Sequence, residues 1–281
     1  MRSSRWYNAW YFSRLNVCAA AAALTACSSR VLVGDIPLQA VLAVTLGTYV
    51  VYALDDVLDR RSDEARFPAL RSLGRVRFGA SVGVMLFALA VLVHLVVARG
   101  VEAPWPLLSQ GCVSIAFCIA TVKWPRLEGA RSWPLVRALF VSLVWASACA
   151  LTPVWWAGQP FSFRAVRGVA FLWQLMFVII LLWEDGECAS DPGRDRSLAD
   201  PITRRRLQAV CACSAFGACA GVALGHVPAA NLSVIAASCV NLLAVRWWTR
   251  VALDGRLRND LLVAANAACC LLVIAVHDAA A

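Results

Sequence analysis

Nine apolar segments divide almost the whole sequence, and they constrain its fold more than any other feature. Each is close to the ~20 residues that a helix needs to cross ~30 Å of hydrocarbon. The pattern predicts a multi-pass membrane protein of about nine transmembrane helices, forming one integral membrane domain over 1–281 with no separate soluble domain. The segments lie at about 15–34, 36–54, 78–98, 105–122, 135–152, 168–183, 207–225, 229–245 and 260–277.

The composition agrees with a membrane protein, because 61% of the 281 residues are hydrophobic and only 15% are charged. The formal net charge of +9 is explained by topology. If the N-terminus is cytoplasmic, 22 of the 26 basic residues fall on the cytoplasmic side. The exceptions are Arg30, Arg99, Arg164 and Arg167. This asymmetry follows the positive-inside rule, so we expect a cell-membrane protein with a cytoplasmic N-terminus and an external C-terminus, and no nucleic-acid partner.

An acidic stretch follows the second apolar segment. Asp55, Asp59 and Asp63 recur every four residues, and Asp56 stands beside the first of them. On a helix, steps of four stay near one face, so the three carboxylates would point at one place. Asp56 lies about 100° away from that face. Like charges this close repel each other, so a compensating cation is expected, and Mg²⁺ prefers carboxylate and phosphate oxygens.

A second acidic stretch follows the sixth apolar segment, on the same predicted side of the membrane. Glu184, Glu187 and Asp191 sit at i, i+3 and i+7, which is one helical stripe. Either stretch alone is typical of a solvated helix end. Two such stretches, each at the mouth of an apolar segment, favour a shared site.

Facing carboxylate clusters of this kind would hold two or more Mg²⁺ ions against a diphosphate. The basic residues expected to bind its outer oxygens are Lys123, Arg126, Arg66 and Arg71. An apolar cavity between the spans would take a long hydrocarbon tail and keep a carbocation away from water. The combination predicts ionisation of an allylic diphosphate.

The acidic stretch 55–63 resembles the first aspartate-rich motif of the UbiA superfamily of membrane prenyltransferases, N/D-x-x-x-D-x-x-x-D. The stripe 184–191 resembles the second motif, D-x-x-D-x-x-x-D, and the loop 123–126 is similar to the basic loop after the fourth span. With the span count and overall length, the resemblance covers nearly the whole chain. It departs from the family where Asp55 replaces the usual Asn and where Glu184 and Glu187 replace Asp. The Arg-Pro segment after the first motif is also shortened, to 66–68.

The resemblance implies an all-α bundle of transmembrane helices around a central cavity. It also implies an Mg²⁺-dependent enzyme that transfers a prenyl group from an isoprenoid diphosphate to a lipophilic acceptor, aromatic or otherwise, within the lipid bilayer. The residues it assigns to catalysis and metal binding are Asp55, Asp59, Asp63, Glu184, Glu187 and Asp191, with Asp56 as a further metal ligand.

Two other functions stay open at this point. A terpene cyclase on the same scaffold would use the same carboxylates and quench the cation within one substrate. A non-catalytic, transporter-like protein would usually place its ionisable residues near the bilayer midplane, whereas these lie at span ends. The stretch 24–27, Leu-Thr-Ala-Cys, also resembles a bacterial lipoprotein cleavage box, so a cleaved signal peptide is the alternative to a first span.

Overall fold

Long helices make up the part of the chain that the structure describes. The structure is a computed structural model, and it describes residues 14–66, 74–100, 105–123 and 134–163, with scattered positions between 165 and 279. Within these helices, the side chains of 59–66, 74–78, 105, 120–123 and 134–137 lie outside the description. The helices are α2 (Leu15–Leu32), α3 (Leu38–Arg66), α5 (Gly74–Ala98), α6 (Trp105–Lys123) and α8 (Pro134–Trp156).

These five helices coincide with the first five predicted apolar segments. Four of them contain a stretch long and apolar enough to cross a membrane: Leu15–Leu32, Leu38–Leu58, Gly79–Ala98 and Ala138–Trp156. The apolar stretch in α6, Pro106–Ile119, is shorter. The described positions in 163–180 and 264–279 are helical as well. The prediction of an all-α, multi-pass membrane protein is therefore confirmed for this part of the chain. The count of nine spans stays a prediction, because the later spans lie largely outside the described residues.

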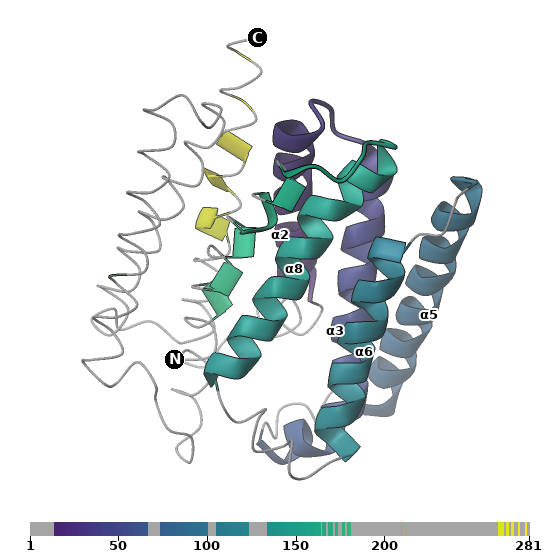
Figure 1. Ribbon diagram of the computed structural model, residues 1–281. Coiled ribbons are helices and arrows are strands. Elements are labelled where there is room, and N and C mark those ends of the chain that lie inside the picture. The colour runs from purple at the N-terminus through teal and green to yellow at the C-terminus, as the bar shows by residue number, and fades with distance from the viewer. Residues whose placement is uncertain are drawn as a thin grey trace.

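α3 is the central helix of the described bundle, and it packs against α2, α5, α6 and α8. Figure 1 shows the five helices standing side by side, with α5 at one edge. The outer face of α5 is apolar and exposed, with Phe87 71% and Val97 70% accessible. An apolar face of this kind is unfavourable in contact with water, so we infer that it faces the lipid.

The core between α2 and α8 is built largely from small side chains. Ala21 and Thr25 of α2 and Ala146 and Ala150 of α8 are fully buried, and Leu24 packs among them. Small residues let two backbones approach closely, which is how helices associate in a membrane. The buried hydroxyl of Thr25 donates to the Ala21 carbonyl at 2.7 Å, so this polar group finds its hydrogen-bond acceptor within α2 itself.

The turn from α2 to α3 is short and sharp. Gly34 adopts a left-handed backbone (φ 90°), which a glycine tolerates without strain, and its N–H donates to the Ser29 carbonyl at 3.2 Å. The chain therefore reverses direction, and α3 runs antiparallel to α2 with Arg14 and the acidic stretch at one end of the hairpin.

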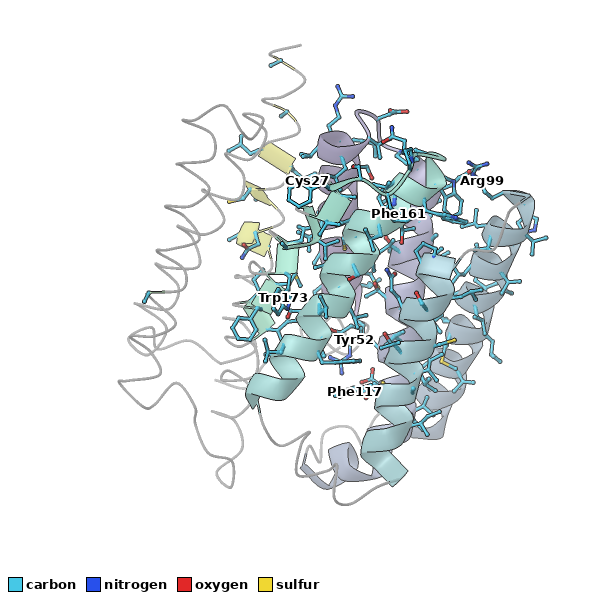
Figure 2. All side chains as sticks on the ribbon, viewed as in Figure 1. Cys27, Tyr52, Arg99, Phe117, Phe161 and Trp173 are labelled. Atoms are coloured by element: carbon cyan, nitrogen blue, oxygen red, sulfur yellow. The ribbon has the colours of Figure 1, made fainter. Side chains whose placement is uncertain are left out.

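The opposite end of the bundle is held by hydrogen bonds between distant segments. The Arg99 guanidinium donates twice to the Trp156 carbonyl, at 3.2 and 2.8 Å, and the Trp156 indole donates to Gln39 Oε1 at 3.1 Å. Figure 2 shows Arg99 and Phe161 toward this end, and Tyr52 and Phe117 toward the acidic end. The predicted external segments thus lie together, as alternating spans require.

Candidate functional site at the acidic end of α3

The acidic stretch belongs to α3 itself. The sequence pattern ends the second apolar segment at 54, but the helix continues without a break to Arg66. Its 29 residues reach ~44 Å at 1.5 Å per residue, more than the ~30 Å of hydrocarbon. The charged end is helical because Asp, Arg and Glu tolerate a helix that leaves the membrane. α3 therefore carries Asp55, Asp59 and Asp63 from the edge of the span outward at steps of four.

Asp56 forms an ion pair with Arg14, the residue that precedes α2. The Arg14 Nε donates to Asp56 Oδ2 at 3.1 Å, and Nη2 donates to Oδ1 at 2.5 Å. Both side chains are mostly covered, with 17% of Arg14 and 30% of Asp56 exposed. A planar guanidinium that meets both carboxylate oxygens is the strongest geometry for such a pair.

Two further contacts fix Arg14 in place. Its backbone is left-handed (φ 59°), which is uncommon for a residue with a side chain, and its carbonyl accepts the first helical bond from the Cys18 N–H at 3.1 Å. Its guanidinium carbon lies 5.8 Å from the centre of the Tyr52 ring, a cation–π distance. Tyr52 in turn meets Trp145 of α8 edge-on, with ring centres 6.3 Å apart. Arg14 therefore ties the start of α2 to α3 beside the acidic stretch, and Tyr52 links α3 to α8.

Lys123, the last residue of α6, belongs to the same end of the bundle. Phe117 of α6 stacks on Phe140 of α8, with ring centres 4.3 Å apart, near the start of α8. α6 runs six residues further, which is ~9 Å along the helix axis. Because α6 packs on α3, this brings the backbone of Lys123 to the acidic end.

The other predicted site residues divide into two groups. Asp59, Asp63 and Arg66 have their backbones on α3, but their side chains are outside the description. The residues that lie wholly outside the described part of the chain are Arg71, Arg126, Glu184, Glu187 and Asp191. Asp55 is described and is partly buried at the end of the apolar span.

The donor chemistry of α3 fits Mg²⁺. Asp55, Asp59 and Asp63 offer carboxylate oxygens at a register that keeps successive groups near one face, and Mg²⁺ binds through one or two carboxylates and phosphate oxygens. Among the side chains described, no three His, Cys, Asp or Glu converge on one point. A complete site would therefore need Asp59, Asp63 or the second acidic stretch.

Sequence reasoning missed Arg14, Tyr52 and Trp145 as part of this region. The positive-inside rule explains Arg14 as one of the basic residues on the cytoplasmic side and indicates no further role for it. A usable signal existed for Tyr52, since it stands four residues before Asp56 and so shares its helix face. For Arg14 the only hint was its position directly before the first apolar segment, on the predicted side of the acidic stretch.

The fold and this region define a class: an α-helical, multi-pass membrane protein with an acidic helix end and basic residues on the same side. Comparison of the chain with protein-family models, with curated proteins and with solved structures found no match.

Proposed function

We propose that the chain is an Mg²⁺-dependent membrane prenyltransferase that moves a prenyl group from an isoprenoid diphosphate to a lipophilic acceptor. The observation that carries the proposal is the course of α3, which leads unbroken from an apolar span into Asp55, Asp59 and Asp63. A site at this boundary suits a substrate with a charged head and an apolar tail. The resemblance of the two acidic stretches to the UbiA motifs supports the same reading.

In this proposal the two acidic stretches would together hold the metal ions. The ligands are Asp55, Asp59 and Asp63 from α3, with Glu184, Glu187 and Asp191 from the second stretch. Bound Mg²⁺ would supply Lewis-acid stabilisation of the negative charge on the leaving diphosphate.

The remaining roles fall to basic and apolar residues. Lys123, whose backbone lies at the acidic end, binds outer diphosphate oxygens together with Arg126, Arg66 and Arg71. The prenyl chain lies between the spans, in a central cavity that excludes water from the allylic cation. Carboxylates orient the head group, and the apolar spans receive the tail.

Diphosphate release by purified protein tests this proposal. The protein is incubated with Mg²⁺ and allylic diphosphates of increasing chain length, with and without lipophilic aromatic acceptors. We expect release that requires Mg²⁺ and a product that joins the prenyl group to an acceptor. Release with a cyclised product and no use of acceptor would instead identify a terpene cyclase. No release with any of the diphosphates would contradict both.

A further inference from the structure

The Arg14–Asp56 pair distinguishes Asp56 from the other aspartates of the acidic stretch. Asp56 is paired with Arg14, whereas Asp55, Asp59 and Asp63 are the proposed metal ligands. Asp56 is rotated about 100° from Asp55 around the helix, but it stands three residues before Asp59 and seven before Asp63, about 60° and 20° from them, so it borders the carboxylate face. A metal ion at that face would be near enough to recruit Asp56 as well. The structure shows both oxygens of Asp56 engaged by Arg14 instead.

We infer that Arg14 is a fixed counter-cation that withholds Asp56 from the metal ions and so limits the ligands on α3 to Asp55, Asp59 and Asp63. The inference deepens the proposed function and rests on it. Arg14 is a positioning residue in this account, because it acts through Asp56 and touches neither metal nor substrate.

The rigidity of Arg14 separates this arrangement from a passing surface contact. The residue is rooted in α2, whose next turns are buried in the core at Val17 and Ala21. Its guanidinium lies over the ring of Tyr52, which stands one turn before Asp56 on α3. The Tyr52 ring and the Asp56 carboxylate therefore both hold the cation. To release Asp56, the side chain would have to give up both contacts at once.

Charge explains why the pair would exclude a metal. Each carboxylate oxygen has a second lone pair, but a divalent ion bound there would stand close to the guanidinium, and two cations at that distance repel strongly. The pair also neutralises one of the carboxylates at the edge of the membrane, where uncompensated acids are costly. The carboxylates left as proposed metal ligands on α3 are then Asp55, Asp59 and Asp63.

The test measures divalent-ion binding without substrate. Mn²⁺ prefers the same carboxylate ligands as Mg²⁺, and the electron paramagnetic resonance signal of the free ion reports how much is bound to detergent-purified protein. The variants are Arg14→Gln, Asp56→Asn and the double variant. Arg30→Gln, at the other end of α2, removes the same charge far from the site and serves as the matched control.

We expect the dissociation constant for Mn²⁺ to be the same for wild type, the double variant and Arg30→Gln within about twofold, because Asp56 is not a ligand. Asp56→Asn alone should weaken Mn²⁺ binding, because it removes the carboxylate that balances the Arg14 charge. Arg14→Gln should bind Mn²⁺ about fivefold more tightly or better, since it frees a carboxylate and removes a repelling cation. The double variant should return to the wild-type value. If Arg14→Gln does not fold, Asp56→Asn and the double variant carry the test. A role confined to stability would leave all these affinities equal.

Two results would overturn the inference alone: Mn²⁺ binding weakened about fivefold or more in the double variant relative to wild type, which would make Asp56 a ligand, or an unchanged affinity in folded Arg14→Gln. Absence of saturable Mn²⁺ binding in the wild type would overturn the inference and the metal site of the proposed function together.

Discussion

Arg14 and Asp56 are 42 residues apart in the sequence, yet they meet through two hydrogen bonds at one end of the bundle. The contact ties the start of α2 to the turn at which α3 leaves its apolar span. At the other end, Arg99 and Gln39 both bond to Trp156. The helix ends near Arg14 and Asp56 therefore lie on one side of the bundle, and those near Trp156 lie on the other. These two groups of helix ends match the cytoplasmic and external sides that the distribution of basic residues predicts.

The first prediction concerns this topology. Reporter fusions that end at Arg66 and at Gly100 should report opposite sides of the membrane, with Arg66 cytoplasmic, because the basic residues concentrate on its side. A fusion at Ala281 should report the same side as Gly100. If the fusions at Arg66 and Ala281 report the same side, the arrangement of nine spans is wrong.

The second prediction concerns stability. Arg14→Gln and Asp56→Asn should each lower the unfolding midpoint of the purified protein, because each removes the opposite charge from a partly buried ion pair. The double variant should lose less than the sum, with a coupling free energy of about 1–2 kcal/mol. Thermal or denaturant unfolding of the four proteins in one detergent measures it. Strictly additive losses would show that the pair contributes nothing to stability.

The third prediction concerns the cleavage-box resemblance at 24–27. Leu24, Thr25 and Cys27 are buried in α2 against the core, with 3%, 0% and 7% exposed. Cleavage before Cys27 would remove most of the buried residues of α2, Leu24 and Thr25 among them, and Arg14 as well. We expect the intact mass of the purified protein to include the residues before Cys27, and Cys27→Ala to change that mass only by the substitution. A mature chain that begins at Cys27 would disprove the first span.

Much of the fold follows from the sequence, because hydrocarbon thickness sets the length of a span. The bounds of α2, α5 and α6 agree with the apolar segments to within a few residues. The extension of α3 to Arg66 was not evident, since hydropathy marks the edge of the membrane and not the end of a helix. In the same way α8 continues through Pro153 to Trp156, beyond the predicted end at 152.

The candidate site was less accessible to sequence reasoning. A spacing of four predicts that Asp55, Asp59 and Asp63 share a face if the stretch is helical, and the stretch is helical. The pairing of Arg14 with Asp56 depends instead on how α2 and α3 pack, and no local pattern encodes that. The second acidic stretch lies outside the described residues, so its part in the site stays a prediction.

The fourth prediction tests that second stretch. Glu187→Gln should lower the rate of diphosphate release by about tenfold or more and raise the Mg²⁺ concentration needed, because it removes a charged ligand. Glu187→Asp should keep measurable activity, since it keeps the carboxylate and restores the residue usual in the resembling family. A Glu187→Gln variant that turns over like wild type would remove the stretch 184–191 from the metal site.

The central claim, that the carboxylates of α3 bind metal for diphosphate chemistry, is tested most directly by diphosphate release from Asp59→Asn. Asp35→Asn is the matched control, because it makes the same chemical change in the turn at the opposite end of the bundle. We predict that Asp59→Asn lowers the release rate about a hundredfold or more while the protein stays folded in membranes, and that Asp35→Asn stays within about twofold of wild type. Release by Asp59→Asn near the wild-type rate, or full wild-type activity in excess chelator, would contradict the account.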